Sequence, residues 1–151
     1  PACNHVERED GKDVIFIKHI SNREGAVFFI PNTDGVNIHE EITPLDSEKV
    51  IEKNYPNSFR ETELLEYLKI KNIDTLVITG MMTQMCVDST TRAAKDFDYE
   101  CIVLGDNCAT RDFIFEDNLV KAEDIQKSFL TALSYYYAKV MITKDYIETC
   151  L

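Results

Sequence analysis

Residues 77–97 read VITGMMTQMCVDSTTRAAKDF, and they place a cysteine shortly after an apolar run. The β-branched residues of this run, which begins at residue 75, predict a buried strand that ends at Gly80. The small side chains that follow Cys86 predict a helix that packs closely against a sheet. We expect the hydroxyl of Thr83 to cap this helix by accepting a backbone N–H, and we expect Cys86 to lie in its first turn.

A cysteine at the start of a helix has chemical consequences. The helix dipole stabilises a thiolate there, and the first backbone N–H groups have no acceptor within the helix. A thiolate beside such donors is a nucleophile beside an oxyanion hole. Cysteines are also common as packing residues, so position alone leaves both readings of Cys86 open. We expect packing roles for the other cysteines, which are Cys3, Cys101, Cys108 and Cys150.

Strand and helix patterns alternate on both sides of this stretch. Strands are predicted at 13–20, 48–54, 75–80, 100–107 and 139–144, and helices at 60–72, after Gly80 and at 122–138, with a final turn at 145–149. Residues 21–47 are irregular and predict a long surface excursion, of the kind that often carries function. The alternation favours the α/β class, namely a three-layer α/β/α fold with a mainly parallel, Rossmann-type sheet and helices on both faces.

The composition argues against several classes of function. The net charge of −11 over 151 residues disfavours binding to nucleic acid and to anionic membranes. No apolar run approaches the roughly 18 residues that cross a membrane. The five cysteines form no C-x-x-C pair and are odd in number, which indicates a reducing compartment. We therefore expect one domain over residues 1–151 in a soluble, cytoplasmic protein.

Three blocks of the sequence resemble a known family. Residues 79–112, TGMMTQMCVDSTTRAAKDFDYECIVLGDNCATRD, closely resemble the signature of the isochorismatase-like cysteine hydrolases, which include nicotinamidases and carbamoylsarcosine amidases. Residues 48–68 resemble the segment of that family that carries its catalytic lysine, which would be Lys53 here. Residues 29–44 resemble the G-T-x-G loop of the family, with Asn32 in place of the first glycine. The three blocks occur in the family's order.

The resemblance implies a mechanism of covalent catalysis by cysteine. Cys86 would attack a carbonyl carbon and form a thioester, with Lys53 maintaining the charge balance of the site. An aspartate would move the protons. The backbone N–H groups of Met82 and Cys86 would hold the oxyanion, and the Met81–Met82 peptide bond would be cis, as is typical of the family. No cofactor is implied.

Two readings stay open for several aromatic residues near these blocks. They could line an apolar substrate pocket or belong to the ordinary core, and the two readings have equal weight. The residues concerned are Phe28, Phe29, Tyr55 and Phe59.

The chain departs from the nicotinamidases at their metal site. Those enzymes carry a D-x-H motif, but Ile17 stands two residues before His19, and the place of the second histidine falls in VFFIP, which has none. His19 and His39 without a carboxylate make a poor metal site. We expect no metal, structural roles for both histidines, and an activity other than that of a nicotinamidase.

A second departure concerns the family's aspartate. That residue ends a first strand with a D-x-Q-like motif, and no such strand is found in residues 1–151, so the fold is expected to lack its first strand. In the family this strand lies in the middle of the sheet, beside the strand that leads to the cysteine. We expect roughly 30–40 residues that carry it and the aspartate to belong before Pro1. Asp106 ends a strand but does not match the motif.

The resulting expectation is a hydrolase that cleaves a C–N bond of a small amide. The family also includes members that act on ureido groups or vinyl ethers, so the substrate stays open. The alternative is a non-enzymatic family member, either an oligomeric scaffold or a thiol redox sensor, for which a reactive Cys86 would also serve. The apolar residues of LSYYYA, at 133–138, indicate a homo-oligomer with an open number of subunits.

Overall fold

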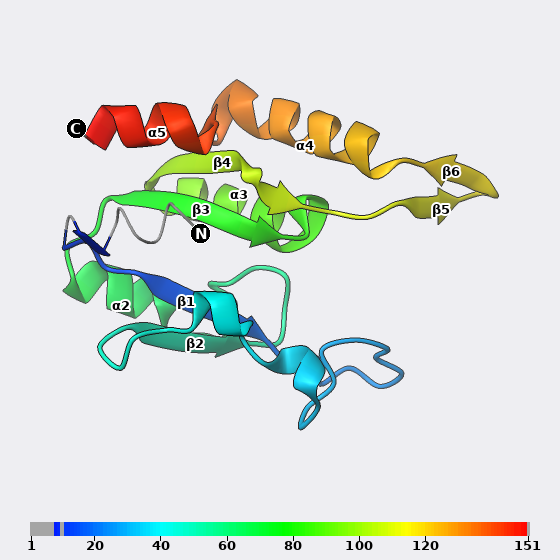
Figure 1. Ribbon diagram of the computed structural model, residues 1–151, viewed down its shortest axis with the longest axis horizontal. Coiled ribbons are helices and arrows are strands. Elements are labelled where there is room, and N and C mark those ends of the chain that lie inside the picture. The colour runs from blue at the N-terminus through cyan, green and yellow to red at the C-terminus, as the bar shows by residue number, and fades with distance from the viewer. Residues whose placement is uncertain (1–7, 10, 151) are drawn as a thin grey trace.

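The structure is a computed structural model, and it describes residues 8–9 and 11–150. Its strands are β1 (Ile15–His19), β2 (Lys49–Lys53), β3 (Thr75–Met81), β4 (Glu100–Ala109), β5 (Phe113–Phe115), β6 (Asn118–Val120) and β7 (Lys139–Met141). Its helices and helical turns are η1 (Asp34–Val36), η2 (Glu40–Ile42), α2 (Leu64–Ile70), η3 (Thr83–Val87), α3 (Asp88–Asp96), α4 (Ala122–Tyr136) and α5 (Thr143–Cys150) (Figure 1).

The parallel strands form two groups. β1 pairs with β2, and β3, β4 and β7 pair in that order. Among the described residues, no ladder joins β1 to β3, although β1 lies between β2 and β3 in the view of Figure 1. The edge of β1 opposite β2 and the edge of β3 opposite β4 therefore have no ladder partner among the described residues. The expectation that a further strand belongs beside β3 stays a prediction.

One hydrophobic core nevertheless spans both groups of strands. Ile51 of β2 and Cys101 of β4 belong to the same buried cluster as Leu64 and Leu68 of α2. Ala94 of α3 also belongs to this cluster, which places α2 and α3 against the same face of the strands. Side-chain packing thus holds the two groups together where backbone hydrogen bonds do not.

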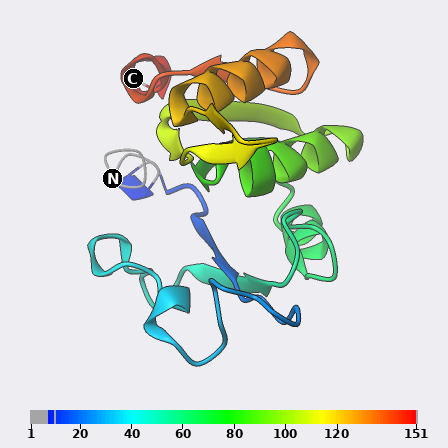
Figure 2. The same cartoon turned by 90° about the vertical axis from the view of Figure 1, so that its right-hand side faces the viewer.

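Helices cover both faces of the larger group. Val103 of β4 packs with Leu133 of α4, whereas the next residue, Leu104, packs with Tyr146 of α5. Successive strand residues point to opposite faces, so α4 and α5 lie on opposite sides. Figure 2 shows α2 and α3 on one side of the strands and α5 on the other. The predicted α/β architecture, with a mainly parallel sheet, is confirmed.

Several predicted boundaries were wrong for identifiable reasons. The helix predicted from residue 60 begins at Leu64, because the Thr62 hydroxyl accepts the Leu64 N–H and donates to the Ser58 carbonyl, which forms a turn. The final turn is a full helix, α5, and Asp106 accepts hydrogen bonds from the N–H and hydroxyl of Thr143 at its start.

The hairpin β5–β6 was not predicted. Its loop residues Glu116 and Asp117 have φ values of 48° and 61°, which the two-residue loop between paired Phe115 and Asn118 requires. Asn-Gly and Asp-Gly are the usual sequence signals for such a loop, and neither is present here. The hairpin projects from the body of the molecule (Figure 1). None of the described helices has the length and apolar character needed to cross a membrane.

Candidate active site

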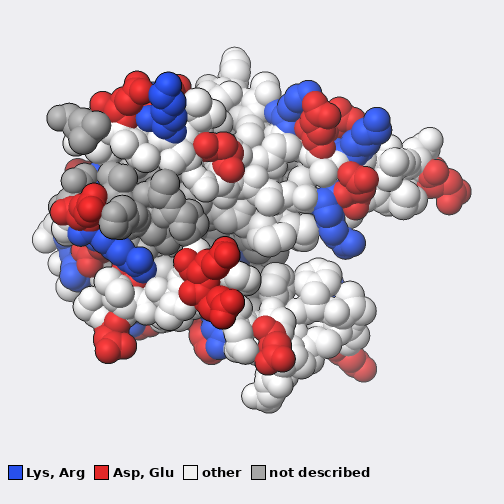
Figure 3. Space-filling model, in the orientation of Figure 1, with Lys and Arg blue, Asp and Glu red and all other residues white. Residues whose placement is uncertain are grey.

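Three side chains meet at the carboxyl ends of the parallel strands. His19 is the last residue of β1, Lys53 is the last residue of β2, and Cys86 lies in η3, directly after β3. His19 and Lys53 are paired in the register of the two strands. In open α/β sheets, reactive groups gather at this edge. Figure 3 shows that the surface is hollowed on this side, between the β5–β6 hairpin and residues 21–47.

Cys86 lies on a single π-helical turn rather than in the first turn of an α-helix. The turn spans Thr83–Val87 and continues into α3. The Met81–Met82 peptide bond before it is cis, as predicted. Gly80 lies inside β3, at a shift in the register of its pairing with β4, and its φ of 126° is a value that favours glycine.

Thr83 does not cap the helix, and this part of the sequence interpretation was wrong. Its side chain is fully buried, and its hydroxyl can donate to Gln126 Oε1 at 2.5 Å or to the Ala109 carbonyl at 3.2 Å. The Gln126 amide in turn donates to the carbonyls of Gly105 and Cys108. The threonine therefore ties the cysteine turn to β4 and α4, because a buried hydroxyl must find a partner.

The thiol of Cys86 and the ring of His19 are neighbours. Cys86 Sγ lies 3.8 Å from His19 Nδ1. The His19 ring stacks on Phe29, with ring centroids 5.1 Å apart and planes inclined by 18°. Burial lowers the pKa of His19, and the positive charge of Lys53 lowers it further. Near neutral pH the imidazole is therefore uncharged and able to accept a proton.

Lys53 is a buried amine beside the same thiol. Its side chain and backbone together are 4% exposed, and Nζ donates a hydrogen bond of 2.5 Å to the Pro56 carbonyl. Burial lowers the pKa of Lys53, while its hydrogen bond and charge interaction with Cys86 act in the opposite direction. Lysine side chains are mostly exposed, so this burial is unusual and keeps Lys53 a candidate for a chemical role.

The four aromatic residues proposed for a substrate pocket separate into two sets. Phe29 contacts His19, and Phe28 packs edge-on against Phe29 at 5.4 Å, so these two extend from the cysteine. Phe59 belongs to the hydrophobic core and packs on Phe97 and Tyr99. Tyr55 lies beneath the Arg60 guanidinium at 3.7 Å. Among the described residues, ring contacts therefore connect Phe28 and Phe29 to His19, and a pocket role for any of the four aromatic residues stays a prediction.

Limited alkylation with iodoacetamide is expected to label Cys86 before Cys101 and Cys108. Burial raises the pKa of both latter thiols to about 11, and each is less than a tenth exposed, whereas Cys86 is half-buried. Only a thiolate reacts, so the buried thiols are unreactive near neutral pH. Peptide mapping by mass spectrometry reads out the order of labelling, and an unfolded sample provides the control in which the differences vanish. Earlier labelling of Cys101 or Cys108 would contradict the assignment.

The remaining candidate groups are occupied elsewhere in the fold. His39 Nδ1 accepts the Glu41 N–H at 3.3 Å at the start of η2. Asp106 accepts from Thr143, as described above. In residues 8–9 and 11–150, no cluster of three or more His, Cys, Asp or Glu side chains is arranged to hold a metal ion. Within the same residues, no carboxylate forms a hydrogen bond or ion pair with Cys86, Lys53 or His19.

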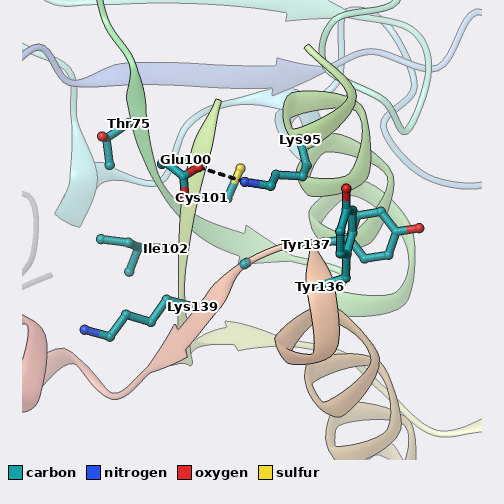
Figure 4. Close-up of a pocket in the computed structure, with 9 residues that line it drawn as sticks. Thr75, Lys95, Glu100, Cys101, Ile102, Tyr136, Tyr137 and Lys139 are labelled. Carbon is teal, nitrogen blue, oxygen red and sulfur yellow. Dashed lines mark hydrogen bonds and ion pairs between the residues drawn. The ribbon is translucent and has the colours of Figure 1, made fainter. Parts of the chain in front are cut away.

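A pocket of about 440 Å³ lies at the opposite edge of the strands (Figure 4). It is bordered by Thr75, Glu100 and Lys139, which begin β3, β4 and β7. Lys95 forms an ion pair with Glu100 there, at 2.8 Å. The thiol in this pocket belongs to Cys101, whose raised pKa makes it a poor nucleophile. Cys86 at the carboxyl edge, and not the thiol of this pocket, therefore stays the candidate nucleophile.

His19 is the neighbour of Cys86 that the sequence interpretation did not place at the site, and the structural role expected for this histidine stays a prediction. A signal was present: the predicted strand 13–20 ends at this residue, and the ends of parallel strands converge at one edge. The stacking partner Phe29 could not be inferred, because it lies in the irregular segment 21–47. Its φ of 56° places it in a conformation that has no simple sequence signal for phenylalanine.

The sequence and the fold of this chain are similar to those of known proteins. A model of the isochorismatase domain matches residues 2–145. The Bacillus subtilis (strain 168) protein YddQ, an uncharacterised isochorismatase family protein, is 42% identical over 141 residues, covering 93% of this chain and 78% of its own. The crystal structure of a proposed isochorismatase hydrolase from Oleispira antarctica superimposes with a TM-score of 0.92 at 39% identity, covering 97% of this chain and 78% of the other.

A shorter match links the chain to an enzyme of stated activity. The ureidoacrylate amidohydrolase RutB of Cronobacter sakazakii (strain ATCC BAA-894) is 39% identical over 67 residues, which cover 44% of this chain and 29% of that enzyme.

Proposed function

Because this chain belongs to the isochorismatase family of hydrolases, we propose that it cleaves the C–N bond of a small amide through a thioester on Cys86. The observation that carries the proposal is the buried Lys53 amine, which interacts with the Cys86 thiol at the carboxyl edge of the strands. A buried cation beside a thiol stabilises the thiolate, which is the attacking form of the nucleophile.

The proposed reaction proceeds in two stages. Cys86 Sγ bonds to the substrate carbonyl carbon, and the carbonyl π electrons move to the oxygen, which the N–H groups of Met82 and Cys86 stabilise. The oxyanion then collapses, the C–N bond breaks, and the amine leaves with a proton. Water attacks the resulting thioester, the C–S bond breaks, and the acid product leaves. Lys53 balances the negative charge that passes between sulphur and oxygen.

The substrate is proposed to be small and to carry an apolar or flat group. The ring of Phe29 stacks on His19, the neighbour of Cys86, and Phe28 packs against Phe29; aromatic faces favour such groups. The amidohydrolase name of RutB supports an amide-type bond as the point of cleavage. The family resemblance assigns proton transfer to an aspartate, and the described residues place no carboxylate in contact with Cys86.

A screen of small amides with detection of released ammonia tests the proposal. The purified protein is expected to release ammonia from at least one primary amide, and release should survive dialysis against a chelator because no metal is assigned a role. Activity that is lost on chelation and restored by zinc would overturn the metal-free mechanism. A folded protein that cleaves no amide, but whose Cys86 is readily oxidised, would support the alternative of a thiol redox sensor.

A further inference from the structure

We infer that two copies of this chain associate through the β5–β6 hairpin, with their β6 edges paired antiparallel about a two-fold axis at Leu119. The hairpin is a separate two-stranded sheet, and no ladder joins it to the other described strands. Figure 1 shows it projecting beyond the start of α4. A lone two-stranded hairpin is at best marginally stable in water, so a further strand beside it would stabilise it. The partner copy supplies that strand, and the inference does not depend on the reaction at Cys86.

The hairpin carries several apolar side chains that stay exposed in the single chain. Ile114 and Leu119 are directly opposite each other in the register, so they share one face, and they are 68% and 57% exposed. Phe115, on the other face, is also mostly exposed. A single exposed apolar residue is ordinary on a protein surface, whereas several on one short projecting element indicate a contact surface.

The backbone of β6 has hydrogen-bonding groups at its outer edge. Phe115 and Asn118 close the two-residue loop, and the closing residues of such a turn are hydrogen-bonded to each other. The next pair, Ile114 and Leu119, is then a pair without mutual hydrogen bonds, so the N–H and C=O of Leu119 point away from β5. Among the described residues, no backbone hydrogen bond reaches them from another element. Two copies of Leu119 across a two-fold axis satisfy each other's groups.

Charges at the two ends of β6 are complementary in this arrangement. A two-fold axis at Leu119 places Asp117 of one copy opposite Lys121 of the other, and the symmetry makes the same contact twice. Lys121 has φ −71° and ψ 145°, which continue the extended backbone of β6 up to the start of α4. Within the described residues, neither Asp117 nor Lys121 forms an ion pair. Opposite charges that face each other across two strands stabilise the pairing.

The edge of β5 is less suited to pairing with its own copy. The corresponding two-fold axis would pass through Ile114 and place Asp112 of one copy opposite Glu116 of the other. Like charges directly opposite each other destabilise a sheet. They would offset the attraction between Arg111 and Asp117, which the same axis would bring together. The charge pattern therefore favours β6 as the edge that pairs.

The hairpin is small for a protein interface. Residues 111–121 are fewer than the roughly 20–30 residues that each partner contributes to an interface of standard size. We therefore expect a reversible dimer that dissociates on dilution, which sedimentation velocity over a range of concentrations measures. A chain that stays monomeric up to its solubility limit would overturn the inference.

Charge reversal at the two ends of β6 tests the pairing. Asp117→Lys and Lys121→Glu each place like charges opposite each other in a homodimer, and each should raise the dimer dissociation constant about tenfold or more. An equimolar mixture of the two variants should regain the wild-type association, because the heterodimer has opposite charges at both contacts. Arg111→Glu, at the base of β5, is the matched control and should associate like the wild type. Variants that are folded by circular dichroism but stay dissociated when mixed would overturn the inference.

A disulfide across the axis gives a second readout without a change of charge. Directly opposite residues of a hydrogen-bonded antiparallel pair have Cα atoms about 5.5 Å apart, which a disulfide can span. Leu119→Cys is therefore expected to give a covalent dimer under a mild oxidant, with the new disulfide identified by mass spectrometry of unreduced peptides. Ile114→Cys should not cross-link, because three strand spacings, about 14 Å in all, separate it from its copy. Cross-linking of Ile114→Cys but not of Leu119→Cys would overturn the pairing along β6.

The tyrosines at the end of α4 are the competing surface for association. Tyr135 is 92% exposed, and the apolar residues of 133–138 also indicated an oligomer. Tyr135→Ser should leave the dissociation constant unchanged if the hairpin is the interface. Loss of association in Tyr135→Ser, together with wild-type association in Lys121→Glu, would overturn the inference and place the interface on α4.

Discussion

Replacement of Cys86 by alanine is expected to reduce amide hydrolysis at least about 10³-fold, to the background rate. The proposed reaction passes through a bond between Sγ and the carbonyl carbon, so no partial pathway remains once the sulphur is removed. Cys86 is only half-buried and belongs to none of the buried hydrophobic clusters, so the unfolding free energy should change by less than about 1 kcal/mol. Ammonia release and urea unfolding measure the two effects.

Cys150→Ala is the matched control for this experiment. Cys150 is also half-buried, but it lies in α5, where its sulphur accepts from Lys12 Nζ at 3.6 Å. This variant should keep the wild-type rate. Trapping of a thioester by mass spectrometry, present in the wild type and absent from Cys86→Ala, would identify the covalent intermediate directly. Hydrolysis by Cys86→Ala at a rate within tenfold of wild type would rule out the thiol as nucleophile.

The main elements of the fold were predictable because their signals are local. The β-branched run of β3 and the leucines of α2 each fit one periodicity, and both elements form near the expected residues. The gap between β1 and β3 is not a local property. Which strands pair depends on the edges that each presents in three dimensions, and hydrophobic periodicity carries no information on that choice. The hairpin was missed for a related reason, because its turn uses Glu116 and Asp117.

The site shows the same division between local and distant information. Cys86 could be singled out from its position after a strand, but the partner of Thr83 could not, because Gln126 lies on α4, 43 residues further along the chain. Lys53 has the sequence context of an ordinary surface lysine at the end of a strand, and only the family resemblance separated it from that reading. Its burial arises from Pro56 and from the packing of β2 against β1, which are tertiary features.

The charge at position 53 also affects the stability of the protein. Burial is the main reason why the pKa of Lys53 is lower in the folded protein than in the unfolded chain, where it is about 10.4. At pH values between these two pKa values, the unfolded chain therefore binds more protons than the folded protein. Stability should therefore rise with pH across this window, and the cost of burying the charged amine should be fully present below it. A side chain of similar shape without the charge avoids this cost.

Lys53→Met is accordingly expected to separate catalysis from stability. Amide hydrolysis should fall by about 10²-fold or more, because no positive charge then balances the thiolate and the oxyanion. The unfolding free energy near neutral pH should be unchanged or higher by about 1 kcal/mol, since a buried charge is replaced by an apolar chain of similar length. The Pro56 carbonyl loses the Lys53 donor but keeps the Thr90 hydroxyl at 3.4 Å. Urea unfolding at several pH values measures the change.

The control is Lys18→Met, which removes a half-buried lysine of the neighbouring strand that pairs with Glu52. It should alter stability by less than about 1 kcal/mol, because exposed ion pairs contribute little, and it should leave hydrolysis unchanged. A structural lysine at position 53 would give the reverse of the expected pattern, with stability lost and activity kept. Activity lost together with a flatter dependence of stability on pH would instead show that the buried charge is maintained for the reaction, at a cost to the fold.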